Sequence, residues 1–80
     1  MPRLTPVHWK VLECIFKLDG FVLARQEGDH RAYEKSGCLR PIIIPTYKSI
    51  DIEIIKTNMR TAVMSREKYF QYLKVCQKSS

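Results

Sequence analysis

The chain has 80 residues, enough for one domain with one modest hydrophobic core. Its 45% hydrophobic and 28% charged residues lie near the averages of globular proteins, which argues against disorder. Fourteen Lys and Arg against eight Asp and Glu give a net charge of +6. This excess favours a polyanionic partner, nucleic acid first and an acidic protein second, although a merely basic surface explains it equally well.

The cysteine pattern and the hydropathy of the sequence indicate the cellular compartment. Cys14, Cys38 and Cys76 are odd in number, far apart in the chain and without CxxC spacing. This pattern fits neither a disulfide scaffold nor a zinc site. We therefore expect reduced, mostly buried thiols in a cytoplasmic protein without metal or other cofactor. No apolar run approaches the ~20 residues that span a bilayer, and no signal-peptide pattern is present, so no membrane association is expected.

The N-terminal segment predicts an amphipathic helix. Thr5 followed by Pro6 is a typical helix start, with a capping hydroxyl and proline at the first helical position. Asp19-Gly20 predicts its end, because glycine suits the left-handed residue after the last turn. Between them, apolar residues recur at spacings of three and four and form one stripe, widened by two aromatic residues: Val7, Val11, Cys14, Ile15 and Leu18, with Trp9 and Phe16.

The middle of the chain predicts three strands. Residues 21–26 and 30–35 alternate in the manner of half-buried strands, and they flank Glu27, Gly28 and Asp29. Gly28 can adopt positive φ without steric cost, so a tight hairpin turn is expected there. A second turn follows at residues 36–38. Residues 40–45 are β-branched and bounded by prolines, which predicts a third strand and an antiparallel meander.

The C-terminal third predicts two helices. Ile50, Ile52 and Ile54 alternate as in a strand, but apolar residues repeat at three and four over a longer window. We therefore predict a helix from Asp51 to about Met64. A short last helix follows, capped by Ser65, with four apolar positions: Tyr69, Phe70, Leu73 and Cys76. Residues 1–80 should form a single α+β domain of order α-β-β-β-α plus a short C-terminal helix, with helices on one face of the three-stranded antiparallel sheet.

The candidate catalytic residue is His30. It begins a strand directly after the turn, beside Arg31 and close to Arg25. Taken alone, an ordinary surface position explains this histidine better than catalysis does. RNA, however, carries its own nucleophile, the 2′-hydroxyl, so a protein needs only proton transfer and charge stabilisation to cleave it. An imidazole and a few cations would suffice without a metal, and the products would be a 2′,3′-cyclic phosphate and a 5′-hydroxyl.

Six further residues are expected to bind the RNA: Arg25, Gly28, Arg31, Lys35, Tyr47 and Lys48. For the two lysines, a solvated surface position is an equally good explanation. Tyr33 suits cross-strand packing better than base stacking. Asp29 could orient the imidazole of His30, but favouring the turn is its safer interpretation.

Four segments of the chain together form a recognisable pattern: Asp19–Phe21, Arg25–Tyr33 with its glycine-x-histidine element, Ile43–Pro45 before a helix, and Met64–Phe70. This pattern resembles the HicA toxin family. The resemblance extends from about Pro6 to Leu73. Many members of the family have serine where this chain has Asp29, and histidine near the position of Tyr47.

The resemblance implies a fold similar to double-stranded-RNA-binding domains. It also implies that the chain is the toxin of a type II toxin–antitoxin pair, a ribosome-independent mRNA interferase with His30 as the catalytic residue. Its partners would be mRNA and a HicB-type antitoxin that masks the site. Two alternatives remain open from the residues: an RNA-binding module of the same fold that does not cleave, and a domain that docks an acidic protein.

Overall fold

The computed structural model describes residues 3–78, which form an α+β structure with three helices and one three-stranded antiparallel sheet. The strand order is β1-β2-β3, as a meander requires. The elements, in chain order, are α1 (Trp9–Leu18), β1 (Val22–Glu27), β2 (His30–Glu34), β3 (Ile42–Pro45), α2 (Ile52–Ala62) and α3 (Arg66–Lys78). The predicted order and topology are confirmed.

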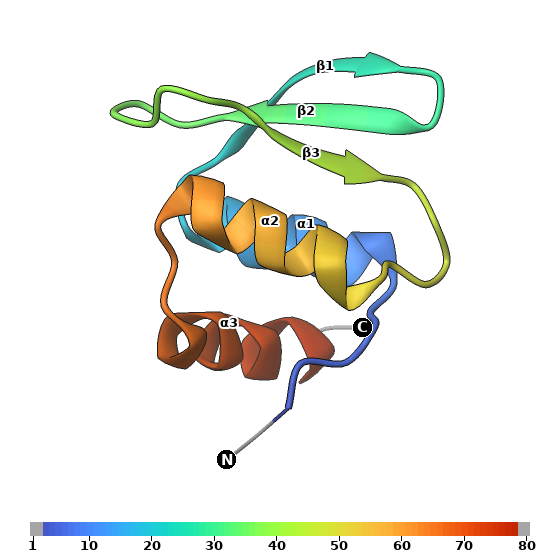
Figure 1. The fold of residues 1–80 in the computed structure, drawn as a ribbon, viewed down its shortest axis with the longest axis vertical. Coiled ribbons are helices and arrows are strands. Elements are labelled where there is room, and N and C mark those ends of the chain that lie inside the picture. Colours follow the sequence, from blue (N-terminus) through green and yellow to red (C-terminus); the bar gives the residue numbers. More distant parts are fainter. Residues whose placement is uncertain (1–2, 79–80) are drawn as a thin grey trace.

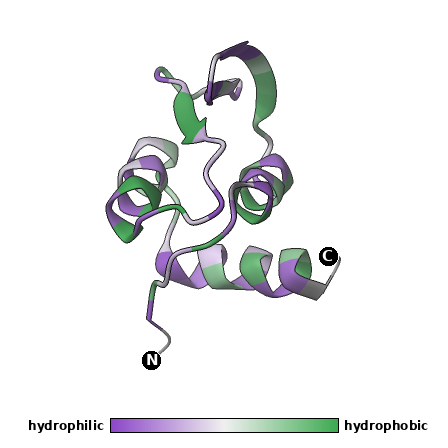
Figure 2. Ribbon diagram, turned by 90° about the vertical axis from the view of Figure 1, so that its right-hand side faces the viewer, coloured by the Kyte–Doolittle hydropathy of each residue, from purple (hydrophilic) through white to green (hydrophobic). Residues whose placement is uncertain are grey.

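The elements are stacked in three layers. The sheet lies on one side, α1 and α2 lie beneath one of its faces, and α3 crosses beneath the two helices on the side away from the sheet (Figures 1 and 2). The last helix was predicted to be short. It is instead 13 residues long and covers the helices. The opposite face of the sheet carries no helix in the described structure, so functional side chains can lie there.

The hydrophobic core fills both spaces between the layers. Phe16 at the end of α1 meets Phe21 edge to face, with ring centroids 5.7 Å apart. Because α1 is contacted by the sheet and by α3, its buried stripe differs from the predicted one: Leu12 is fully buried, whereas Leu18 is 48% exposed. The side chains buried almost completely come from all three layers: Leu12, Ile15, Phe16, Phe21, Tyr33, Ile42, Ile44, Ile50, Ile55 and Tyr69.

Helix α1 begins later than predicted. His8, not Thr5, is its N-cap, and the His8 Nδ1 atom accepts a hydrogen bond from the backbone N–H of Lys10 at 3.1 Å. The preceding residues are extended because Val7 pairs with Ile50, whose N–H donates to the Val7 carbonyl at 2.8 Å. This tertiary pairing overrides the Thr-Pro signal. The other end agrees with the prediction, since Asp19 is the C-cap and Gly20 follows with a φ of +104°.

Strand β1 was predicted to be half-buried, but every one of its residues is exposed. It is an edge strand that pairs with β2 alone, and the twisted sheet carries it away from the helices (Figure 1). The register shifts between Leu23 and Arg25, which marks a bulge. The predicted alternation of buried and exposed residues is therefore absent from β1, because no layer covers either of its faces.

The ambiguous segment after β3 contains both predicted patterns. Ile50 makes the isolated bridge with Val7, and helix α2 then runs from Ile52 with Asp51 as its N-cap. The helix ends at Ala62, and its C-cap Val63 adopts a left-handed conformation with φ +53° and is 90% exposed. Inside the helix, the buried polar side chain of Asn58 donates a hydrogen bond to the Ile43 carbonyl on β3 at 2.9 Å.

Asn58→Ala should therefore lower the free energy of unfolding by about 1–3 kcal/mol, because it leaves a strand carbonyl without its donor in a buried place. Urea denaturation would measure the change. Lys56→Ala, an exposed position of the same helix, is the matched control and should change stability by less than about 0.5 kcal/mol. Equal midpoints for the two variants would show that the hydrogen bond contributes nothing.

The expectation of reduced thiols is wrong for two of the three cysteines. Cys14 on α1 and Cys76 on α3 form a disulfide across 62 residues of sequence, with Cα atoms 5.9 Å apart. Cys38 is a free thiol in the β2–β3 loop. Spacing in the sequence could not reveal the bond, because it forms only where α3 packs on α1. In residues 3–78, no helix is long and apolar enough to cross a membrane.

Candidate functional site

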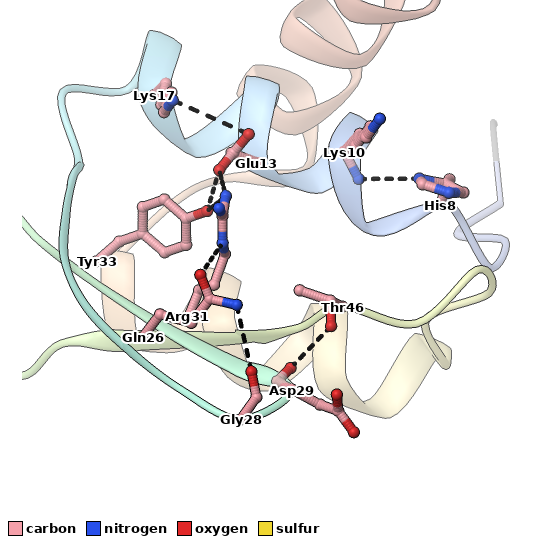
Figure 3. A network of polar contacts seen from close by, with 10 residues as sticks. All are labelled: His8, Lys10, Glu13, Lys17, Gln26, Gly28, Asp29, Arg31, Tyr33 and Thr46. Carbon is pink, nitrogen blue, oxygen red and sulfur yellow. Dashed lines mark hydrogen bonds and ion pairs between the residues drawn. The ribbon is translucent and has the colours of Figure 1, made fainter.

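The hairpin turn between β1 and β2 builds the candidate site. Glu27 pairs with His30, so Gly28 and Asp29 form a two-residue turn. Gly28 has a φ of +56° at the first central position, as a type II′ turn requires. Thr46, after β3, donates two hydrogen bonds to the Asp29 carbonyl, from its N–H at 2.7 Å and from Oγ1 at 3.2 Å, the second of which is drawn in Figure 3. The turn is thereby tied to the loop that follows β3.

His30 is exposed at the start of β2, on the sheet face that carries no helix. It lines a shallow hollow of about 70 Å³ together with four residues of all three strands: Arg25, Glu27, Ala32 and Ile43. Arg25 Nε lies 3.5 Å from Glu27 Oε1. The Tyr47 ring stands edge-on to the imidazole, with centroids 6.5 Å apart and an interplanar angle of 70°. His30 thus has a cation, a carboxylate and an aromatic ring around it.

The backbone of Tyr47 is held by α1. The N–H of Trp9, at the start of the helix, donates to the Tyr47 carbonyl at 3.1 Å. Lys48 follows in the same loop and is exposed. Both predicted residues therefore lie in the loop that approaches His30, and the Tyr47 ring, 45% exposed, keeps part of its surface for a ligand.

Arg31 lies on the opposite face from His30, toward α1. Its Nη1 atom donates to Glu13 Oε2 at 2.6 Å and to the Tyr33 hydroxyl at 3.5 Å. Its guanidinium carbon lies 4.9 Å from the centre of the Trp9 ring. The hydrogen bond with Tyr33, followed by the Glu13 carboxylate, raises the pKa of Arg31. A half-buried cation in these contacts packs the strand against the helix and does not share a surface with His30.

The Arg31 contacts continue to the turn. Arg31 Nε donates to Gln26 Oε1 at 3.2 Å, and Gln26 Nε2 donates to the Gly28 carbonyl at 3.2 Å (Figure 3). The hydrogen bonds run without interruption from Glu13 on α1 to the turn before His30. Sequence reasoning missed Glu13 and Gln26. The alternation of side chains along a strand could have shown that Arg31 is not part of the site. It places Arg31 on the same face as Tyr33 and on the opposite face from His30.

Two other predicted residues are also accounted for. Tyr33 is fully buried and its hydroxyl donates to Glu13, which agrees with the packing role. Lys35 follows the far end of β2, where its Nζ lies 3.4 Å from Asp19 Oδ2 and 5.7 Å from the centre of the Phe21 ring. The structure therefore brings Arg25, Gly28 and Tyr47 to His30, and it places Arg31 and Lys35 elsewhere.

Within the described residues, no group of three or more His, Cys, Asp or Glu side chains is arranged to hold a metal ion. What His30 and its neighbours provide is a titratable imidazole, a guanidinium and a carboxylate on one open surface. No protein-family model matches the chain, and no curated protein sequence matches it.

Proposed function

We propose that the chain is a metal-independent and ribosome-independent endoribonuclease that cleaves mRNA, the toxin of a HicA/HicB type II toxin–antitoxin pair. The observation that carries the proposal is the exposed His30 beside Arg25 in a hollow of the uncovered sheet face. The turn that presents it is fixed by Thr46 on one side and by Gln26 on the other. The net charge of +6 favours an RNA ligand.

In this mechanism the 2′-hydroxyl of the RNA attacks the adjacent phosphorus, and His30 acts as a general acid/base. Arg25 stabilises the negative charge that develops on the phosphorane. The exposed part of Tyr47 provides a surface on which a flanking base stacks, and Lys48 contacts a neighbouring phosphate. DNA is not a substrate, because it lacks the 2′-hydroxyl.

The architecture is compatible with a fold of the double-stranded-RNA-binding-domain type, which the resemblance to HicA toxins implies. The mRNA substrate implies a cytoplasmic location, and there Cys14 and Cys76 would meet a reducing environment. A HicB-type antitoxin would neutralise the enzyme by covering the uncovered face of the sheet around His30.

His30→Ala is the direct test. Purified protein is incubated with a long mRNA in EDTA, and the products are separated on a gel. We expect wild type to cleave and His30→Ala to be slower by about 100-fold or more, with RNA binding retained, because the variant lacks the proton-transfer group. His8→Ala, the same change at the other histidine, is the matched control and should still cleave.

Three outcomes would contradict this proposal. Equal cleavage by wild type and His30→Ala would assign the activity to another residue or to a contaminant. Binding of RNA by both proteins with cleavage by neither would replace the nuclease with the alternative function, a non-catalytic RNA-binding module. Absence of RNA binding even at low salt, where phosphate contacts are strongest, would favour an acidic protein as the partner.

A further inference from the structure

A second titratable residue, Glu27, stands directly across from His30. The two residues close the β1–β2 hairpin as a paired position. Paired residues of an antiparallel hairpin project to the same face of the sheet, with Cβ atoms about 4.5–5.5 Å apart. Both residues line the hollow on the uncovered face, and the Glu27 side chain is 81% exposed. A carboxylate and an imidazole are therefore both accessible to one ligand.

The position of Arg25 adds a third component. Its Nε lies 3.5 Å from Glu27 Oε1, so the guanidinium holds the carboxylate at the edge of the hollow. A guanidinium carries five N–H donors, and a single contact of this kind leaves others for a phosphate oxygen. A phosphate placed over the hollow would then lie between the carboxylate and the imidazole.

We propose that Glu27 is the second proton-transfer residue of the ribonuclease centre, an inference that rests on the function proposed above. The Glu27 carboxylate takes the proton of the 2′-hydroxyl as the bond between the 2′-oxygen and phosphorus forms. The bond between phosphorus and the 5′-oxygen breaks, and the His30 imidazolium gives its proton to that oxygen. The products are a 2′,3′-cyclic phosphate and a 5′-hydroxyl, and no other reactant is consumed.

The other groups near His30 suit this role less well. Asp29 lies in the turn, where its carbonyl accepts the hydrogen bonds of Thr46 and its carboxylate points away from the residues bonded around the turn (Figure 3). Tyr47 presents its ring to the imidazole. Arg25 carries only N–H donors and no acceptor, so it does not suit the role of a base. Among the described residues that line the hollow, Glu27 is the only carboxylate.

The test is the pH dependence of single-turnover cleavage of a short RNA between about pH 4 and pH 9. An ionised carboxylate and a protonated imidazole together give a bell-shaped profile. Glu27→Gln should lower the maximal rate by about 100-fold and remove the acidic limb of the profile. His30→Asn should remove the alkaline limb. Glu34→Gln, an exposed carboxylate at the other end of β2, is the matched control and should leave rate and profile unchanged.

The outcomes separate this inference from the function on which it rests. A folded Glu27→Gln variant with the rate and profile of wild type, beside a slowed His30→Asn variant that lacks the alkaline limb, overturns the role of Glu27 and leaves the nuclease standing. A faster Glu27→Gln variant overturns it too, because the carboxylate would then only repel phosphate. Wild-type protein that does not cleave removes both proposals. Thermal melts of each variant establish that the changes do not act through unfolding.

Discussion

Reduction of the disulfide between Cys14 and Cys76 is expected to lower the free energy of unfolding by about 4 kcal/mol. The bond joins α1 to α3 across 62 residues, and a link over a loop of this length removes much of the entropy of the unfolded chain. A domain of this size has a total stability of only about 5–15 kcal/mol. The melting temperature should therefore fall by about 15–30 °C.

Thermal unfolding followed by circular dichroism, with and without dithiothreitol, measures this effect. Cys14→Ser and Cys76→Ser should each melt as reduced wild type does and should not respond to the reductant. Cys38→Ser, which removes the free thiol of the β2–β3 loop, should keep the wild-type response. If a thiol reagent detects three free thiols in denatured wild type that has not been reduced, the disulfide does not form.

Alkaline pH should destabilise the fold through two buried tyrosines. Burial raises the pKa of Tyr69 to about 12, and burial together with the hydrogen bond to Glu13 raises that of Tyr33 to about 12. Both pKa values are about 10 in the unfolded chain, so the fold has its full stability below pH 10. Above pH 10 the unfolded chain ionises first, and about 2 kcal/mol should be lost for each tyrosine by pH 12.

The variant Tyr69→Phe removes the contribution of one of the two tyrosines to the loss of stability at alkaline pH. Within residues 3–78 the buried Tyr69 hydroxyl has no hydrogen-bond partner, so its removal should leave stability at pH 7 equal or higher. Urea denaturation at pH 7 and at pH 11 compares the two proteins, and the variant should lose less stability between these pH values. A variant that is less stable at pH 7, or that loses as much stability as wild type at pH 11, would contradict the burial argument.

Local signals in the sequence predicted the elements well, because those signals act within a few residues. The turn at Gly28, the end of α1 at Asp19 and the Ser65 cap of α3 are each where the sequence placed them. In α3, the Ser65 side chain accepts from the N–H of Lys68 at 3.1 Å. The apolar repeat at three and four correctly predicted helix α2 despite the strand-like alternation of its isoleucines. Ile50, just before the helix, does form a β-bridge with Val7.

The sequence could not predict how the layers of helices and strands pack on one another. The disulfide, the third layer formed by α3 and the exposure of β1 all depend on which surfaces meet in space. The same limit applies to the site. Proximity in sequence grouped Arg31 with His30, whereas the strand places Arg31 against Glu13. Glu27 and Tyr47 reach His30 by cross-strand pairing and by loop packing.

The disulfide also closes a covalent ring. Residues 14–76 form this ring, which includes the whole sheet, the hairpin turn and all of α2. A protease that cuts the exposed loop at Leu39 would open the backbone, but the two fragments would stay attached through the sulfur atoms. In oxidised protein, one cut in that loop therefore leaves the fragment with α1 and the hairpin of His30 covalently attached to the fragment with β3, α2 and α3.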